Sequence, residues 1–282
     1  MEWITDILLD ALLDSLKLLP FLFGAYLFLE YLEHRGSAKM QALLAGSRRS
    51  GPFWGALLGC VPQCGFSVAA ANLYAGHAIT LGTLLAVFIS TSDEAVPVLI
   101  AYPDKLPLVG ALLLSKAAIA LITGLLVDLF LSRRTRAGEP VPGLFCECCD
   151  ESDGIFLSAL RHTAATFCFV FLISLVLGAG IELLGSARLG ALLLNGSFLQ
   201  PVIAAVLGLI PNCAVSVALT GLFAEGSISF GSLVAGLSSG SGLGLMVLFR
   251  ANPDRRQNAR ILLLLTAVGT GAGILLQALL RI

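Results

Sequence analysis

The sequence predicts an all-α polytopic membrane protein made of two inverted repeats. Each repeat has three crossings and a re-entrant helical hairpin, which gives ten helical segments. Composition and an internal duplication carry this prediction. Of the 282 residues, 57% are hydrophobic and 12% are charged, and the mean hydropathy is +0.93. A water-soluble domain of this length cannot bury so much apolar surface, so we expect several membrane crossings.

Apolar runs long enough to cross a bilayer recur along the chain. Two further apolar runs, 52–76 and 201–225, are interrupted by Pro62 and Pro211, and proline breaks a helix. The uninterrupted runs cover approximately 18–33, 79–101, 107–131, 157–184, 228–249 and 258–280.

The second half of the chain repeats the first half at a shift of 149 positions (201 − 52). At this shift "PFWGALLGCVPQCGFSVAAANLYAG" (52–76) lies over "PVIAAVLGLIPNCAVSVALTGLFAE" (201–225), and proline, glycine, cysteine and serine positions match. We therefore divide the chain into a first repeat (1–131), a linker (132–154) and a second repeat (155–282).

The distribution of basic residues favours inverted rather than parallel repeats, because Lys and Arg accumulate on the cytoplasmic side. If the two interrupted runs are hairpins, twelve basic residues lie inside and four outside; if they cross fully, the best division is ten and six. The equivalent loops agree with this result. Loop 34–51 carries four basic residues, whereas loop 183–200 carries only Arg188. Linker 132–154 is then cytoplasmic.

Inverted repeats with broken helices are typical of secondary transporters, whose binding sites lie at the breaks near the bilayer midplane. Backbone left unpaired at a break is tolerated there only where protein or a water-filled cavity covers it. The expected breaks are "VPQC" (61–64), "ISTSDEAVP" (89–97), "IPNC" (210–213) and "SSGSGLGLM" (238–246). We expect these four breaks to meet in one site.

The breaks carry thiols, amides, hydroxyls and carboxylates, a mixed oxygen and sulfur set that suits a metal cation. Carboxylates inside a membrane are costly and are therefore functional candidates. The expected substrate-binding residues are Gln63, Cys64, Ser90, Thr91, Ser92, Asp93, Glu94, Asn212, Cys213, Ser239 and Ser241. Of these, the expected metal ligands are Cys64, Asp93, Glu94, Asn212 and Cys213. Proton coupling through Asp93 or Glu94 is a hypothesis that follows.

Several of these residues have a structural alternative. Asp93 and Glu94 would also cap the half-helix that follows them. Cys60 is either a further thiol ligand or a packing residue, since its repeat mate is Leu209. Lys116 either snorkels to the membrane surface, which we expect, or pairs with the two acids.

Other chemistry finds less support in the sequence. The linker contains "FCECCDESD", in which Cys146, Cys148 and Cys149 lack zinc-site spacing. An intramembrane enzyme would need a base beside its thiol, but the histidines fall near segment ends, so we expect no enzyme and no cofactor. The net charge of −1 excludes the basic field that nucleic acid requires.

Three long motifs carry a family resemblance: "GCVPQCGFSVAAANLYAG", "STSDEAVPVLIA" and "GLIPNCAVSVALTGLFAEGSISFGSLVAGLSSGSGLGLMVLFR". The sequence resembles the ten-helix heavy-metal exporter family, whose members are labelled arsenic-efflux proteins or manganese transporters. The resemblance covers nearly the whole chain and implies export of a metal or metalloid. Linkers in that family are rich in His as well as Cys, whereas linker 132–154 has no histidine, which weakens a metal-binding role for it.

The sequence therefore predicts a multi-pass plasma-membrane secondary transporter that exports a heavy-metal cation, with a manganese-like divalent ion favoured. The alternative is an efflux permease for arsenite or another metalloid, or for a small organic solute or anion. Half-helix N-termini near Gly65 and Ser92 would attract an anion, and Asp93 and Glu94 argue against one. The expected partners are the transported ion, the lipid bilayer and protons; no motif decides for or against a homodimer.

Overall fold

The computed structural model describes two stretches of helices and single positions elsewhere. The described ranges are 50–61, 65–92, 95–100, 102–131, 199–211 and 213–280, with single positions between 16 and 27 and between 156 and 172. The linker 132–154 lies outside them. The elements of the first stretch are α3 (Gly51–Gly59), α4 (Gly65–Ala75), α5 (Leu81–Ser90), α6 (Ala95–Ile100), the short 3-10 helix η1 (Pro103–Lys105) and α7 (Leu106–Phe130).

The second stretch repeats this series of helices at the shift found in the sequence. Helix α3 begins at Gly51 and α10 at Gln200, and α5 begins at Leu81 and α12 at Phe230, each 149 positions later. The second series is α10 (Gln200–Gly208), α11 (Cys213–Ala224), α12 (Phe230–Ser239), α13 (Leu243–Ala251) and α14 (Arg255–Leu280).

The helix ends confirm that the expected breaks interrupt apolar runs. The run 52–76 is divided into α3 and α4, and the run 201–225 into α10 and α11. Polar and glycine residues likewise separate α5 from α6 and α12 from α13. Each half of the described chain therefore contains two helical discontinuities.

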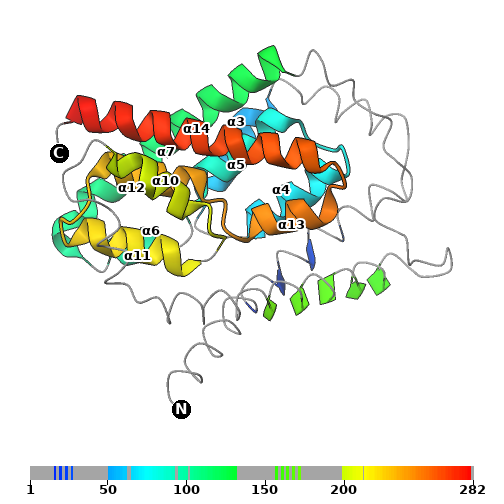
Figure 1. The fold of residues 1–282 in the computed structure, drawn as a ribbon. Coiled ribbons are helices and arrows are strands. Elements are labelled where there is room, and N and C mark those ends of the chain that lie inside the picture. The colour runs from blue at the N-terminus through cyan, green and yellow to red at the C-terminus, as the bar shows by residue number, and fades with distance from the viewer. Residues whose placement is uncertain are drawn as a thin grey trace.

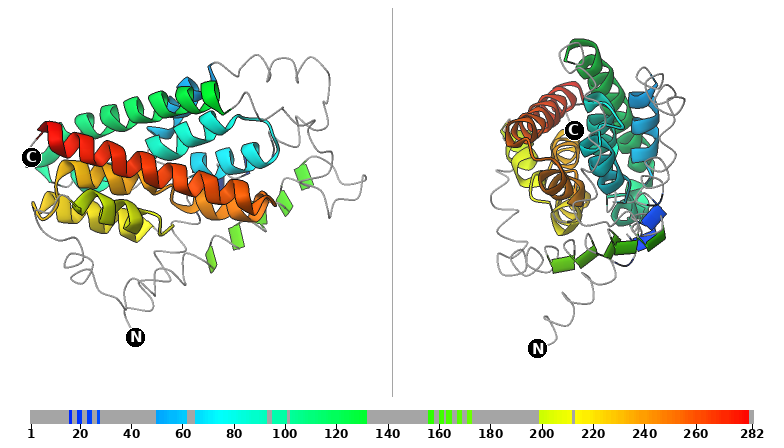
Figure 2. Two further views of the ribbon diagram at one scale, coloured as in Figure 1. Left: turned by 45° about the horizontal axis from the view of Figure 1, so that its top comes forward. Right: turned by 90° about the vertical axis from the view of Figure 1, so that its right-hand side faces the viewer.

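Each half forms a bundle of three helices, and the remaining helices of each half pack against helices of the other half. Helices α3, α5 and α7 pack on one another, as do α10, α12 and α14. In contrast, α4 packs against α13, and α11 packs against α6. Figures 1 and 2 show that α7 (toward green) and α14 (orange to red) run in opposite chain directions along the molecule.

In the described part of the chain, four helical segments are long and apolar enough to cross a membrane, by length and composition. They are Leu81–Ile100, Leu106–Phe130, Phe230–Ala251 and Arg255–Leu279. They match four of the runs expected from the sequence, and two of them contain one of the breaks. The runs 18–33 and 157–184 lie outside the described ranges except for single helical positions.

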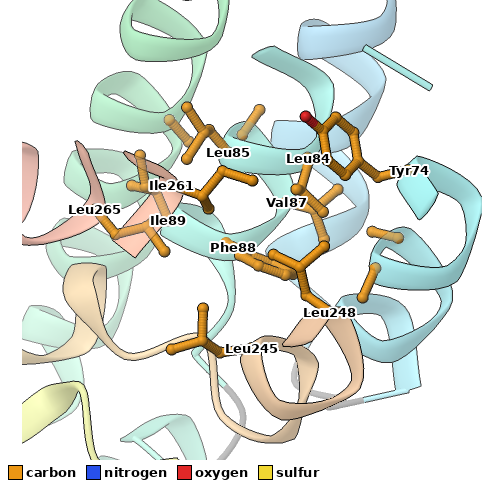
Figure 3. Close-up of a cluster of buried hydrophobic side chains, with 14 of the residues drawn as sticks. Tyr74, Leu84, Leu85, Val87, Phe88, Ile89, Leu245, Leu248, Ile261 and Leu265 are labelled. Carbon is orange, nitrogen blue, oxygen red and sulfur yellow. The ribbon is translucent and has the colours of Figure 1, made fainter. Parts of the chain in front are cut away.

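Helix α5 is the centre of the largest cluster of buried apolar side chains. Figure 3 shows Phe88 and Ile89 of α5 beside Leu245 of α13 and Ile261 of α14, while Tyr74 of α4 lies near Leu84. The core of the first half is thus completed by helices of the second half. This packing fixes the end of α5, where the first-half break begins.

Helices α5 and α12, each of which is followed by a break, begin with equivalent N-terminal caps. Thr80 Oγ1 accepts from Thr83 N, and Ser229 Oγ accepts from Ser232 N, both at 3.1 Å. A side-chain oxygen in this position satisfies a backbone N–H that has no partner inside the helix.

Different residues anchor the two caps. Asp128 of α7 accepts from Thr80 Oγ1 at 2.6 Å and from Gly82 N at 2.9 Å. In the second half Gln200 Oε1 accepts from Ser229 N at 3.0 Å and from Ser232 Oγ at 2.9 Å. A carboxylate therefore holds one cap, and a neutral amide holds the other.

Candidate functional site

The residues expected from the sequence divide into described and undescribed ones. Gln63, Cys64, Asp93, Glu94 and Asn212 lie outside the described residues, and Cys213 is described only as the first residue of α11. The described candidates are Ser90, Thr91, Ser92, Ser239 and Ser241, and all five are buried.

At the first-half break, the hydroxyl groups donate to nearby backbone carbonyls, and Val87 O also accepts from Thr91 N at 3.0 Å. Ser90 Oγ donates to Ala86 O at 2.7 Å, and Thr91 Oγ1 donates to Val87 O at 2.7 Å. Ser92 Oγ donates to Ser90 O at 3.4 Å. Thr91 ends α5, with φ −58° and ψ 127°, so the chain leaves the helix at this residue.

At the second-half break, Ser239 has the same arrangement as its repeat mate Ser90. Ser239 Oγ donates to Ala235 O at 3.0 Å and also to Ala205 O of α10 at 2.6 Å. The chain then leaves the helix at Gly240 and turns at Gly242, whose φ of 52° is easily adopted only by glycine. The repeat mate of Gly242 is Asp93 (242 − 149), so the two breaks differ in charge.

These hydroxyl groups are held within the helices of their own half. A carbonyl oxygen can only accept, so Ser90, Thr91 and Ser239 spend their single hydrogen on the backbone. Bonds to the carbonyl four residues earlier are common for Ser and Thr in helices. The close approach of Gly59 of α3 to Ser90 Oγ and of Gly208 of α10 to Ser239 Oγ shows that these two hydroxyls face neighbouring helices.

Close contacts connect helix ends that border the breaks. A Cβ at Gly59, the last residue of α3, would collide with Ser90 Oγ, and one at Gly208, the last residue of α10, would lie 2.8 Å from Ser239 Oγ. A Cβ at Gly244 of α13 would lie 2.8 Å from Ser67 Cβ in the first turn of α4. These contacts place the end of α3 beside the end of α5, the end of α10 beside the end of α12, and the start of α13 beside the start of α4; that all four breaks meet in one site stays a prediction.

Lys116 joins the two halves at the ends of α5 and α12. The side chain is 0% exposed, and its Nζ donates to the carbonyl oxygens of Thr91 and, at 2.9 Å, of Leu237. The expectation that Lys116 snorkels to the surface is wrong, because helices of both halves enclose it. Pairing with Asp93 or Glu94 involves atoms outside the described residues.

Two buried polar residues were not expected from the sequence. Ser238 Oγ and Asn72 Nδ2 are buried without a hydrogen-bond partner among the described residues, as is Ser241 Oγ. Ser238 lies in the "SSGSGLGLM" break, but its repeat mate Ile89 is apolar, so the duplication gave no reason to select it. Such groups cost free energy unless a ligand or water satisfies them.

Thiols and acids form no site by themselves in the described part of the chain. Among the described residues, no three His, Cys, Asp or Glu side chains gather as metal ligands. Cys60 is half-buried, and its Sγ donates to Ala56 O at 3.2 Å. Its thiol therefore points back into its own helix, which favours the packing role over the ligand role.

Comparison with known proteins gives one match. A family model described as "Putative, 10TM heavy-metal exporter" matches residues 2–184 and 155–280, two overlapping regions that together span nearly the whole chain. None of the curated proteins and none of the solved structures matches the chain.

Proposed function

Because the chain belongs to the family of ten-transmembrane-helix heavy-metal exporters, we propose that it is a secondary transporter with a manganese-like divalent cation as its favoured cargo. The site lies where the four helix breaks meet. The observation that carries the choice of a cation is at the C-terminal ends of α5 and α12, where the carbonyl oxygens of Thr91 and Leu237 accept from the buried ammonium of Lys116.

The proposed metal ligands are the side chains that the sequence places in the breaks: Cys64, Asp93, Glu94, Asn212 and Cys213. Two acids supply formal charge −2, and the buried Lys116 supplies +1, so the site keeps a net charge of −1 (−2 + 1). A net negative site attracts a divalent cation in a low-dielectric interior. Protonation of Asp93 or Glu94 after release of the metal would couple export to protons.

The proposed architecture is a pair of inverted repeats, 1–131 and 155–282, joined by cytoplasmic linker 132–154 in the plasma membrane. Support comes from the 149-position spacing of the helices, the opposite directions of α7 and α14, and the reciprocal packing of α4 on α13 and α11 on α6. A two-fold axis in the membrane plane relates repeats in this way.

One second candidate, a neutral metalloid hydroxide such as arsenite, follows from the thiols and from Lys116. Cys64 and Cys213 suit a soft metalloid, and a buried ammonium repels a cation but not a neutral hydroxide. The two candidates make different use of Asp93 and Cys64, so substitutions at these positions separate them.

The test is transport into liposomes that contain the purified protein. Uptake of manganese, zinc, cadmium and arsenite is measured for the wild type, Asp93→Asn and Cys64→Ser. The matched controls are Asp104→Asn and Cys168→Ser, which change the same residue types at exposed positions. We expect divalent transport to fall mainly in Asp93→Asn, by about a hundredfold if the lost interaction is ~3 kcal/mol.

Two other results would redirect the proposal. Arsenite transport that is lost mainly in Cys64→Ser would support the metalloid candidate. If the wild type transports none of the four substrates, the proposed metal cargo is wrong and an organic solute or anion takes its place.

A further inference from the structure

The packing of the surrounding helices does not by itself require a charged residue at position 116. It lies in the apolar helix α7, and its ammonium bonds to Thr91 O in the first half and Leu237 O in the second. One residue is inserted in the second repeat before "NPDR" (252–255), so the repeat mate of Lys116 is near Thr266, which donates to Leu262 O of its own helix at 2.8 Å. The cationic link between the two halves is therefore present in one copy.

The carbonyls that hold Lys116 lie at the C-terminal ends of two half-helices. Helix α5 ends at Ser90 with Thr91 as its cap, and α12 ends at Ser239, so Leu237 lies in its last turn. The last carbonyls of a helix have no partner within it, and the helix dipole makes this end negative. In membrane transporters, such half-helix ends bind cations.

Further oxygen atoms beside these helix ends are buried and unused. Ser238 and Ser241 follow Leu237 closely in the chain, and the hydroxyl oxygens of both have no partner among the described residues. Hydroxyl and carbonyl oxygens are the kind of donors that hard metal cations accept.

We infer that Lys116 is a tethered cation that occupies, in the cargo-free protein, the carbonyl oxygens that the transported metal takes over; this inference rests on the proposed function. A divalent metal and an ammonium cannot share the same carbonyls, because like charges repel strongly where the dielectric constant is low. The flexible stem of lysine lets the ammonium withdraw.

Displacement of Lys116 has a structural consequence. The side chain links α5 and α12 through the two hydrogen bonds, and the metal that replaces it brings ligands of its own. Cargo binding therefore exchanges one connection between the halves for another. Lys116 is therefore a positioning residue, because its displacement changes how the two halves are held together. It also sets the affinity of the site for the cation.

The first experiment measures binding of Mn²⁺ and Cd²⁺ to the purified full-length protein by calorimetry. The variants are Lys116→Met, which removes the competing charge, Lys116→Arg, which keeps it, and Lys105→Met, which removes a lysine from the η1 turn. We expect Lys116→Met to bind about tenfold more tightly and to turn over more slowly, while Lys116→Arg and Lys105→Met bind like the wild type. Unchanged or weaker binding by a folded Lys116→Met would overturn the inference.

A second experiment tests the carbonyl site without any metal. Methylammonium should raise the melting temperature of Lys116→Ala, because it restores an N–H cation to the two carbonyls. Tetramethylammonium, which has the charge but no N–H group, should not, and neither compound should stabilise the wild type. Equal effects of the two compounds on Lys116→Ala would overturn the inference.

The two experiments also separate this inference from the proposed function. A wild type that transports no metal overturns the proposed cargo, and the methylammonium result then still decides whether the carbonyls form a cation site. Metal transport with no methylammonium effect leaves the exporter proposal in place and removes the role of Lys116.

Discussion

The two pairs of helices that cross between the halves are equivalent in sequence position but not in packing. In the α4–α13 pair, Val68 is 0% exposed and Gly244 fits directly against Ser67. In the α11–α6 pair, the mate of Val68 is Val217, which is 40% exposed. The α11–α6 pair buries Val215, Leu219, Ala95 and Leu99 instead, so the two pairs differ in which repeat positions they bury.

This difference has a physical meaning for a duplicated transporter. Two similar units that adopt different packing give a molecule whose two ends are not equivalent, which a carrier needs in order to open to one side at a time. The three-helix bundles, in contrast, are alike in both halves, down to the caps of α5 and α12. We therefore call the three-helix bundles the constant part of the two halves, and the crossed pairs, α4–α13 and α11–α6, the variable part.

The largest expected effect concerns the constant part, at the glycines that end α3 and α10. A Cβ at Gly208 would run into the backbone of Gly236, whose carbonyl carbon would be 2.8 Å away. Backbone cannot rotate away, so we expect Gly208→Ala to cost about 3 kcal/mol. At Gly59 the nearest atom is the Ser90 hydroxyl, which can rotate, and the nearest backbone atom, Val87 O, would be 2.7 Å away, which is less close than Gly236 O is at Gly208, so Gly59→Ala should cost about half as much.

The measurement is detergent unfolding of both glycine variants, with Gly271→Ala as the control. Nothing lies within 4 Å of a Cβ at Gly271, so that variant should unfold like the wild type. Equal losses for Gly208→Ala and Gly59→Ala would contradict the expectation that the closer backbone contact at Gly208 costs more.

The next largest losses of stability are expected at the residues that anchor the two caps, Gln200 and Asp128. Gln200→Ala leaves the buried Ser232 hydroxyl and Ser229 N–H without their acceptor, which costs about 2 kcal/mol. Asp128→Asn keeps one acceptor oxygen and should cost about 1 kcal/mol. Melting temperatures of the two variants, measured at low and high salt, check this order. Only the decrease in melting temperature of Asp128→Asn relative to the wild type should become smaller at high salt, because only this substitution removes a charge.

The crossed pairs provide a smaller effect that directly tests their asymmetry. Val68→Ala removes two buried carbon atoms and should cost about 1.5 kcal/mol, at ~0.8 kcal/mol for each. Val217→Ala acts at a partly exposed position and should cost about 0.5 kcal/mol or less. Unfolding curves for the two variants give the comparison, and equal losses would mean that the pairs are packed alike.

The effects expected at the caps themselves are small as well. Ser229→Ala removes one side-chain bond to the helix start and should cost about 1 kcal/mol or slightly less. Thr80→Ala should cost slightly more, because it also loses the 2.6 Å bond to Asp128. Thermal melts of both variants test this order. A Thr80→Ser variant keeps the hydroxyl and should melt close to the wild type.

Much of this arrangement could be predicted from residue types and from the duplication. The prolines at 62 and 211 and the polar run 89–97 predicted where the helices end, because proline and unpaired backbone interrupt apolar helices locally. The burial of Ser90, Thr91 and Ser239 followed from the same pattern. These features depend on neighbours in the chain, so sequence reasoning reaches them.

Other features depend on distant parts of the chain. Lys116 reads as a membrane-surface lysine until Leu237 is placed beside it, and Ser238 has the apolar mate Ile89. Gln200 has the mate Gly51, so the duplication concealed its role as an anchor. Comparison of the repeats identifies residues that the two halves share, but it misses residues, such as Lys116 and Gln200, that are present in one half alone.

The two bonds of Lys116 also bear on how the chain is made. Leu237 is 121 residues downstream of Lys116, so α7 leaves the ribosome and meets the bilayer before α12 exists. A lysine at the centre of a membrane helix costs about 2.5–3.5 kcal/mol on insertion. Until the second half is synthesised, one of its carbonyl partners is missing. The first half therefore reaches its final form only after translation of the second, and a chain cut within the linker should assemble only when both fragments are produced together.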